Sequence, residues 1–255
     1  MAADLQSPPE SLGGPLQAIR GLLFIALMYL LLLVMGLLCL IPSKISRNWA
    51  MVFIHAYCDA VMWMLRVIVG TRCEVRGTPP TGACLVASKH QSFLDIIILT
   101  RALPRPAFVM KKSIRWVPVL GVYAERLGSI PIDRSDGGQA MKAMIAGAGA
   151  QAQGRQLIVF AQGTRVPPGV DAPFRPGVLR LREKTGLPIT LAALNTGWFW
   201  PRVGIRRTPG TAVVEFLTQI DASGKVTIDE VAAPIEAASK RLADEAAAEI
   251  YGTAH

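Results

Sequence analysis

Residues 83–95 read ACLVASKHQSFLD, and this stretch decides the fold. The apolar run Ala83–Ala87 has the length and composition of a buried β-strand. Residues 93–100 are apolar enough for a packed helix, and Ser92 just before them is a typical helix N-cap. The stretch therefore predicts a strand, a short loop and a helix, which is the repeating unit of α/β proteins.

His90 and Asp95 are the best candidates for chemistry within this unit. Five residues of a continuous helix turn through about 500°, and residues five apart in a strand point to opposite faces. The two side chains therefore meet only where a loop enters a helix. Asp95 would then lie in the first helical turn, where the helix dipole favours a carboxylate that can hold and polarise an imidazole. This predicts His90 as a general base. The alternative is an ordinary polar pair without a catalytic role.

The remaining histidines and the cysteines do not suggest a metal site. His55 lies in an apolar, helix-like stretch, and His255 is the last residue. The cysteines lack the paired spacing of zinc ligands, so we expect no metal and interpret them as buried thiols of a reducing compartment. They are Cys39, Cys58, Cys73 and Cys84. Ser92 could be proposed as a nucleophile, but its position is better explained by helix capping.

Two basic residues follow short apolar runs further along the chain. Lys111 comes after residues 107–110, and Arg134 comes after residues 130–132. Both runs have strand character, and ligands of open α/β sheets gather where the strands end. Lys111 and Arg134 are therefore candidate anion-binding residues. The alternative for each is a solvated basic surface.

A third segment, residues 157–165, is an apolar strand that ends in Gly163, Thr164 and Arg165. Glycine lets the backbone approach a ligand closely, and a hydroxyl and a guanidinium are suitable donors for phosphate oxygens. A simple turn would explain Gly163 and Thr164 equally well.

Taken in order, these segments resemble the lysophosphatidic acid acyltransferases, formally 1-acylglycerol-3-phosphate O-acyltransferases, within the wider glycerolipid acyltransferases. The resemblance covers roughly residues 83–194. Its blocks are His-x4-Asp at His90–Asp95, the stretches 111–121 and 132–134, Phe-Ala-Gln-Gly-Thr-Arg at 160–165, the run 187–191 around Pro188, and Phe-Arg-Pro-Gly at 174–177.

Two positions depart from the family pattern. Lys89 precedes the histidine where asparagine is common, and Gln162 replaces the usual glutamate of the third block. Glutamine keeps the shape and one acceptor but loses the charge, so a role that needs that glutamate as a base does not carry over. Gln162 and Arg175 are expected in the substrate pocket.

The resemblance implies acyl transfer from a thioester, acyl-CoA or acyl carrier protein, to the sn-2 hydroxyl of lysophosphatidic acid, giving phosphatidic acid in phospholipid synthesis. His90 would take the hydroxyl proton, paired with Asp95. The phosphate would be held by Lys111, Arg134, Gly163, Thr164 and Arg165. No bound cofactor and no acyl-enzyme are expected. The alternatives are acylation of another lyso-lipid or of glycerol 3-phosphate, and a catalytically silent protein that only binds lipid phosphate.

The first quarter of the chain predicts a membrane anchor. Residues 21–41 carry no charge, a length close to that needed to cross the roughly 30 Å hydrocarbon core. A second apolar stretch, 49–69, would lie in the interface or pack beside the first as a hairpin. We expect a disordered start over 1–19, membrane-anchoring helices over 20–70 and an α/β acyltransferase domain over 71–255. The alternative is that both stretches are core helices of a soluble domain.

Charge favours the cytoplasmic face for the catalytic domain. The chain has a formal net charge of +9, and basic residues follow the first apolar stretch closely, as the positive-inside rule requires. Similar acyltransferases also favour a helical motif embedded at that face. Such a domain is attracted to anionic phospholipids. Nucleic acid is excluded as a partner because no recognition motif accompanies the charge.

Short apolar runs and helical patterns alternate through the rest of the chain. Runs near residues 83, 108, 130, 157, 189 and 213 are separated by helical segments near 94, 116, 140 and 179, and a helix is expected over 227–251. This alternation predicts an α/β fold with a mostly parallel sheet flanked by helices, attached to the hairpin-like anchor.

Overall fold

A single sheet forms the centre of the molecule. The computed structural model describes residues 14–133, 137–151 and 154–252. Within these ranges seven strands are joined in the order β1-β7-β6-β2-β5-β3-β4. The strands are β1 (Thr71–Arg76), β2 (Cys84–Ser88), β3 (Pro106–Lys111), β4 (Ile130–Ile132), β5 (Gln156–Phe160), β6 (Ile189–Leu194) and β7 (Gly210–Ile220).

Five neighbouring strands run in one direction, which confirms the predicted mostly parallel sheet. The pairs β2–β5, β2–β6, β3–β5 and β3–β4 are all parallel, whereas β7 is antiparallel to β6. The carboxyl ends of β2, β3, β4, β5 and β6 therefore share one edge, the edge where ligands of such sheets bind.

The sequence did not indicate β1, which pairs with β7 in parallel. Residues 71–76 alternate between apolar and charged side chains, and only Thr71 is buried. This is the pattern of an edge strand, where one side of the backbone is unpaired and charged side chains remain in water. A search for continuous apolar runs overlooks such a strand.

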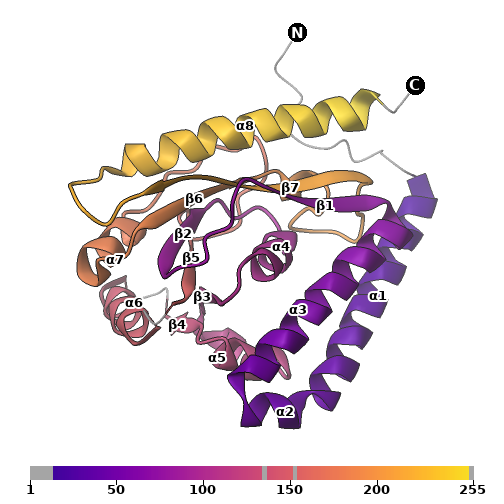
Figure 1. The fold of residues 1–255 in the computed structure, drawn as a ribbon. Coiled ribbons are helices and arrows are strands. Elements are labelled where there is room, and N and C mark those ends of the chain that lie inside the picture. The colour runs from indigo at the N-terminus through magenta and orange to yellow at the C-terminus, as the bar shows by residue number, and fades with distance from the viewer. Residues whose placement is uncertain (1–13, 134–136, 152–153, 253–255) are drawn as a thin grey trace.

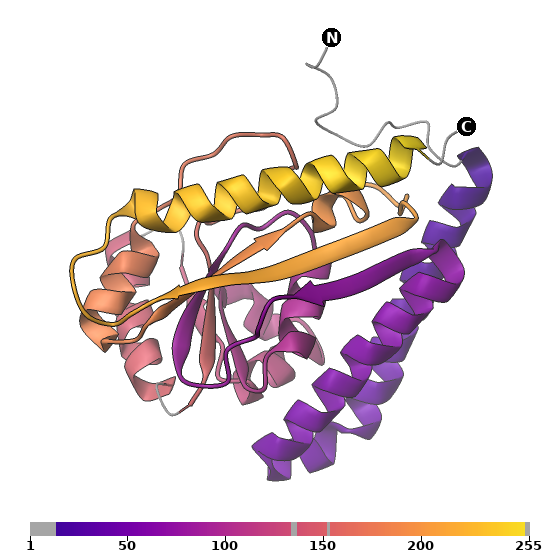
Figure 2. The same ribbon diagram turned by 45° about the horizontal axis from the view of Figure 1, so that its top comes forward.

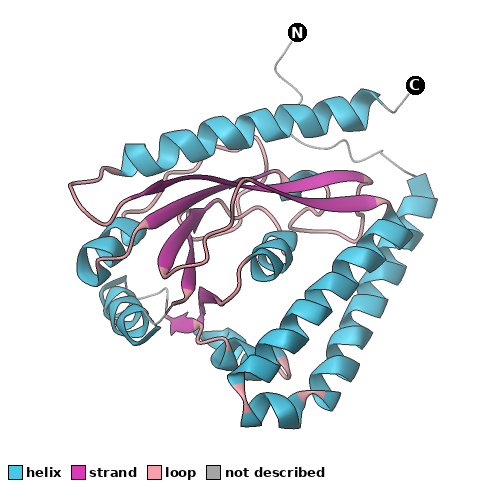
Figure 3. Cartoon of the chain, in the orientation of Figure 1, coloured by secondary structure: helices cyan, strands magenta, loops and turns pink. Residues whose placement is uncertain are grey.

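Helices cover both faces of the sheet (Figures 1 and 3). One face packs against α6 (Gly137–Gln151), α7 (Gly177–Thr185) and the start of α8 (Ile228–Gly252), with Leu85 and Leu157 in that core. The other face, with Val86 and Ile158, packs against α4 (Leu94–Ala102) and the N-terminal helices. Alternate residues of each strand thus serve opposite cores. Figure 2 shows α8, the expected C-terminal helix, running lengthwise along β7.

The N-terminal helices form the predicted hairpin. α1 (Gly14–Leu38) and α3 (Arg47–Met64) run side by side, joined by the short α2 (Leu40–Ile45), and a π-helical turn, η1 (Leu65–Val69), extends α3 (Figure 1). The helical stretches 14–38 and 47–69 have maximal mean hydropathies of 2.7 and 1.6, and both are long enough to cross a membrane. Length and composition therefore make the hairpin a candidate membrane anchor.

The first helix begins before residue 20, where the anchor was expected to start. Residues 14–19 are helical, and residues 1–13 lie outside the described part of the chain. The preference of Pro15 for a helix start and the hydrogen bonds of Gln17 explain the earlier start. Pro15 suits the first helical turn, where its missing N–H would have no partner. The Gln17 side-chain amide then donates to the carbonyl oxygens of Val69 and Arg207, at 3.3 and 2.7 Å.

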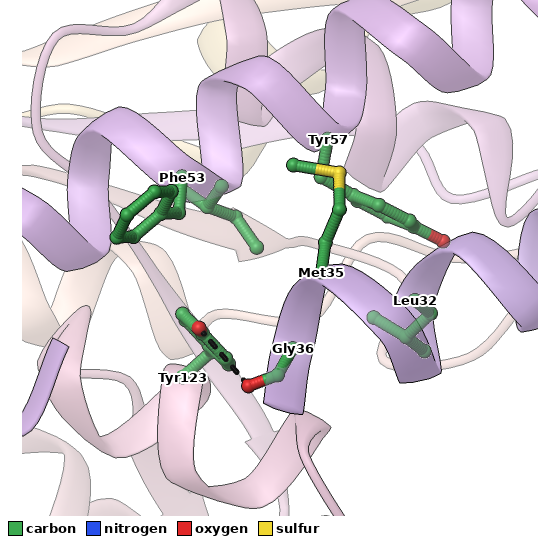
Figure 4. Close-up of a pocket in the computed structure, with 7 residues that line it drawn as sticks. Leu32, Met35, Gly36, Phe53, Tyr57 and Tyr123 are labelled. Carbon is green, nitrogen blue, oxygen red and sulfur yellow. Dashed lines mark hydrogen bonds between the residues drawn. The ribbon is translucent and has the colours of Figure 1, made fainter. Parts of the chain in front are cut away.

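The hairpin packs against the α/β domain along α1. Near one end Phe24 meets Trp200 edge to face, with ring centroids 5.3 Å apart. Near the other end Val119, in the turn before α5 (Leu120–Arg126), fills the space above Gly36. The Tyr123 hydroxyl also donates to the Gly36 carbonyl oxygen at 3.4 Å, as Figure 4 shows. The cavity left at this joint is only about 20 Å³, enough for about one water molecule, so the contact is a packing joint and not a ligand site.

Candidate active site

His90 and Asp95 meet at the carboxyl edge of the sheet, as predicted. The loop after β2 carries His90, and α4 begins at Leu94, so Asp95 lies in its first turn. His90 Nδ1 lies 2.9 Å from Asp95 Oδ2. The same β2–loop–α4 unit that decides the fold therefore creates the pair.

Asp95 is fully buried and surrounded by hydrogen-bond donors. The backbone N–H groups of Gln91 and Ser92 donate to Oδ2 at 2.7 and 3.0 Å. The hydroxyl of Thr196 donates to Oδ1. Together with His90, these donors use the acceptor capacity of an ionised carboxylate and fix its orientation. Asp95 in turn fixes the imidazole.

The His90 ring is held on a second side by Phe160, the last residue of β5. The two rings stack with centroids 3.9 Å apart and planes 11° from parallel. The backbone of His90 is also fixed, because its carbonyl oxygen accepts from Val166 N–H at 2.7 Å. An Nδ1–H that donates to Asp95 leaves Nε2 of the same ring as the available base.

Arg165 reaches that second nitrogen. Its Nε lies 3.4 Å from His90 Nε2. The tight turn after β5 makes this possible: Gly163 has a φ of +75°, a conformation that side chains disfavour, and its N–H donates to the Phe160 carbonyl oxygen at 2.9 Å. The structure thus brings the predicted base and the predicted phosphate ligand together.

Ser92 has the geometry of a capping residue, as expected. Its Oγ accepts from Leu94 N–H at 3.0 Å, although Phe93 is the residue directly before the helix. The Ser92 side chain is completely buried and supports the start of α4.

Gln162 and Arg175 organise the loop that follows β5. Gln162 is 3% exposed, and its amide Nε2 donates to the Ala172 carbonyl oxygen at 3.1 Å. The Arg175 side chain passes directly over Gly163, where an added Cβ would lie 3.3 Å from Arg175 Cδ. The backbone N–H of Arg175 donates to the Ala161 carbonyl oxygen at 2.8 Å. Both contacts fold residues 166–176 back over the end of β5.

Two further predicted anion ligands, Lys111 and Thr164, lie in the described part of the chain. Lys111 is the exposed last residue of β3, at the same sheet edge as His90. Thr164 is exposed in the turn before Arg165. Arg134 lies outside the described residues, directly after residue 133.

A mostly apolar cavity of about 300 Å³ lies at the ends of β3, β4 and β5, on the face of the sheet that α6 and α7 cover. Its volume is in the range of small-ligand sites. Residues of β3, β4, β5, α6, α7 and the loop after β5 line it, and they are Val109, Ile132, Gly137, Ala140, Met141, Met144, Val159, Phe160, Ala161, Gly163, Arg175, Pro176, Gly177, Val178 and Arg180. Arg175 and Arg180 bring positive charge to an otherwise apolar wall.

Three contributors to the site were missed in the sequence. Phe160 was noticed only as part of a strand. Thr196 follows β6, and only the order of the strands shows that it faces Asp95. Lys89, noted as a departure from the family, is buried, and its Nζ pairs with Glu236 Oε2 of α8 at 2.7 Å. The polar residues that follow each parallel strand, here Asn195 and Thr196 after β6, were the available signal.

The site offers neither a metal cluster nor a reactive thiol. Among residues 14–133, 137–151 and 154–252, no group of three or more histidine, cysteine or acidic side chains could hold a metal ion. Burial raises the pKa of the Cys84 thiol to about 11, so this cysteine stays protonated near neutral pH.

Comparison with known proteins identifies the family. The Acyltransferase family model matches residues 71–193, which include the sheet edge described above. A 1-acyl-sn-glycerol-3-phosphate acyltransferase from Pseudomonas aeruginosa is 32% identical over 214 residues, covering 82% of this chain and 83% of that protein. The chain belongs to the 1-acyl-sn-glycerol-3-phosphate acyltransferase family.

Other members of this acyltransferase family agree. The human 1-acyl-sn-glycerol-3-phosphate acyltransferase alpha is 31% identical over 66% of this chain and 62% of its own length. The crystal structure of the 1-acyl-sn-glycerophosphate acyltransferase from Thermotoga maritima superposes with a TM-score of 0.72 at 23% identity, covering 89% of this chain and 97% of that one. The latter comparison shows a shared fold.

Proposed function

We propose that the chain transfers a fatty acyl group from a thioester to the sn-2 hydroxyl of 1-acylglycerol 3-phosphate, giving phosphatidic acid. One observation carries the proposal: the Nε2 of an Asp95-bound imidazole lies 3.4 Å from the Arg165 guanidinium. A base and a phosphate ligand side by side suit an acceptor that has a hydroxyl close to a phosphate. The names of the relatives point to the same acceptor.

In the proposed reaction His90 acts through Nε2. The substrate hydroxyl gives its proton to Nε2 as its oxygen attacks the thioester carbon, and the resulting imidazolium is stabilised by Asp95. The C–S bond then breaks, and the leaving thiolate takes the proton back. General-base help of this kind is worth about 10²–10⁴ in rate. The thiol product is coenzyme A or acyl carrier protein.

Arg165 is the proposed main ligand of the substrate phosphate, because a guanidinium can donate two parallel hydrogen bonds to it. Lys111 and Arg134 would add positive charge from the neighbouring strand ends, and the turn at Gly163 and Thr164 would let the backbone approach the phosphate. Gln162 leaves this region without the negative charge of the family glutamate. The apolar cavity beside Phe160 offers room for part of a fatty chain.

The transfer is proposed to be direct, without an acyl-enzyme. Ser92 Oγ is buried and used as a helix cap, and the Cys84 thiol is protonated near neutral pH. An acyl group found covalently attached to the denatured protein would contradict this part of the proposal.

The hairpin is the proposed membrane anchor, with the catalytic domain on the cytoplasmic face. Its outer surface exposes many large apolar side chains, whereas the inner one packs on the domain. If the outer surface of the hairpin lay in the bilayer, the catalytic domain would lie at the membrane interface. The site would then be close to its lipid substrate.

Acyl transfer to lysophosphatidic acid by the detergent-held protein tests the proposal. Both thioester donors are offered, and His90→Ala is compared with His55→Ala, the same change on α3. We expect phosphatidic acid from wild type and His55→Ala, and a loss of at least about 10²-fold for His90→Ala.

Other acceptors belong in the same experiment. Product with glycerol 3-phosphate or another lyso-lipid, but not with lysophosphatidic acid, would overturn the acceptor. Binding of lysophosphatidic acid without product from any acceptor would identify a silent lipid-phosphate-binding protein.

A further inference from the structure

A loop of the catalytic domain exposes apolar side chains next to the anchor. Residues 201–206 precede β7, and within them Val203 is 80% exposed and Ile205 is 46% exposed. Arg202 and Arg206 are exposed on either side of this pair. Apolar side chains flanked by basic ones suit the boundary between lipid headgroups and acyl chains, where both can be satisfied.

The loop is built to hold these side chains outward. Arg207 is only 5% exposed, and its Nη1 donates to the carbonyl oxygens of Gly204 and Arg206 at 3.0 and 2.7 Å. Its guanidinium also lies over the Trp200 ring, 4.5 Å from the centroid. Burying a charged guanidinium is costly. Burial lowers the pKa of Arg207 to about 10. The exposed tip is therefore a fixed feature of the fold.

The same loop is attached to α1. A Cβ on Gly21 would lie 2.2 Å from the Ile205 carbonyl oxygen, so the helix and the loop are in direct backbone contact. The Gln17 side chain binds the Arg207 carbonyl oxygen. At this end α1 exposes Ile19 and Leu22 to solvent. The apolar tip of the loop thus adjoins the exposed apolar surface of the candidate anchor.

The loop is also connected to the active site. Arg202 Nη1 donates to the Arg165 carbonyl oxygen at 3.2 Å. On the other side, Trp200 packs against Phe93, the residue before α4, with centroids 5.7 Å apart. A surface that held this loop would therefore lie close to the proposed phosphate ligand and the catalytic pair.

We propose that residues 202–206 are a second membrane contact of this protein, made with an anionic phospholipid bilayer. Val203 and Ile205 enter the apolar boundary of the bilayer, while Arg202 and Arg206 bind lipid phosphates. The inference rests on the proposed membrane anchoring and extends it, because it places the bilayer surface beside Arg165. Charge complementarity and the contact with α1 identify the partner as a lipid surface.

A fluorescent label at position 203 tests the contact directly. Val203→Cys is labelled with an environment-sensitive fluorophore in the full-length protein, and Val75→Cys, an exposed valine of edge strand β1, is the matched control. The protein is reconstituted in vesicles that contain lipids with a nitroxide quencher. We expect quenching at position 203 and little at position 75. Equal quenching at the two positions would overturn the proposal.

The lipid charge is tested in the same samples. Quenching at position 203 should be stronger in vesicles that mix phosphatidylglycerol with phosphatidylcholine than in phosphatidylcholine alone. Identical quenching in both would overturn the role of Arg202 and Arg206. Labelled wild type provides the blank for the native cysteines, three of which are buried.

Activity separates this contact from the proposed chemistry. Val203→Asp/Ile205→Asp is assayed with long-chain lysophosphatidic acid in vesicles and with a short-chain form dispersed in detergent. We expect a loss of about tenfold in vesicles and little change in detergent. Equal losses in both, or no loss in vesicles, would overturn the membrane contact. Absence of product from wild type in both assays would instead reject the proposed function, and the quenching result would still stand.

Discussion

Asp95 lies at the centre of the hydrogen bonds that organise the proposed active site. Its carboxylate is fully buried, and it accepts from two backbone N–H groups of its own loop, from His90 and from Thr196. The imidazole is thereby fixed on one side by the carboxylate and on its face by Phe160. Such support allows a base to be aligned before the substrate arrives.

Thr196→Val tests the hydrogen bond from Thr196 to Asp95, which joins residues far apart in the sequence. The change keeps the shape of the side chain but leaves Asp95 Oδ1 without its hydroxyl donor. An unsatisfied buried acceptor costs about 1–3 kcal/mol, so we expect lower stability and a kcat below wild type but above that of His90→Ala. Thermal unfolding and steady-state kinetics measure the two effects.

Thr190→Val, the same change in buried β6, is the control. Equal kcat values for the two threonine variants would contradict a role for Thr196 in positioning Asp95.

Gln162→Glu restores the common family residue, yet we expect it to impair this protein. The Gln162 amide donates to the Ala172 carbonyl oxygen, and a carboxylate cannot do so. Its burial would also disfavour the charged form and raise the pKa of the introduced carboxyl group. The free energy of unfolding should therefore fall by about 1–3 kcal/mol at neutral pH. The deficit should shrink as the pH falls below the pKa of the introduced group, because the protonated form carries no charge and can donate.

Urea unfolding at several pH values measures this effect, together with kcat/KM. Gln219→Glu is the control, since it makes the same change at an exposed position of β7. Higher activity with unchanged stability in Gln162→Glu would show that the loop tolerates the family glutamate.

The β2–loop–α4 unit was the most predictable element because its information is local. The apolar run, the capping serine and the five-residue spacing of His90 and Asp95 lie within 13 consecutive residues. Thr196 contacts Asp95 from 101 residues away, and this contact depends on β6 lying beside β2. Periodicity along one chain does not give strand order. The same limit hid β1, whose charged pattern makes sense only at the edge of a sheet.

Gly21 tests the joint between the anchor helix and the catalytic domain. Gly21→Ala should force α1 away from the Ile205 carbonyl oxygen, because that oxygen would lie 2.2 Å from the new Cβ. We expect a loss of about 1–3 kcal/mol in the free energy of unfolding, as for other overpacked contacts. Gly137→Ala is the control in α6, where a Cβ meets nothing within 4 Å. Thermal unfolding in detergent compares them, and equal unfolding temperatures would contradict tight packing at this joint.

At the scale of the whole molecule, N-terminal and C-terminal segments pair and pack against one another. β1 pairs with β7, and α1 packs on residues 200–207. A chain that ends at residue 209 lacks β7 and α8, so β1 and one side of β6 lose their partners. We expect this chain to unfold without a cooperative transition and to be cut rapidly by protease. A chain that ends at residue 252 should behave like the full-length protein. Cooperative unfolding of the shorter chain would show that β7 is dispensable.

The contact between Gln17 and Arg207 spans 190 residues of sequence, and this sets an order of events during synthesis. The apolar helix leaves the ribosome well before the surface that covers one side of it has been made. Throughout that interval α3 can cover part of α1, and the apolar side chains that later meet residues 200–207 can be buried only in a bilayer or in another protein. Delivery to the membrane before the domain folds would protect the nascent chain from aggregation.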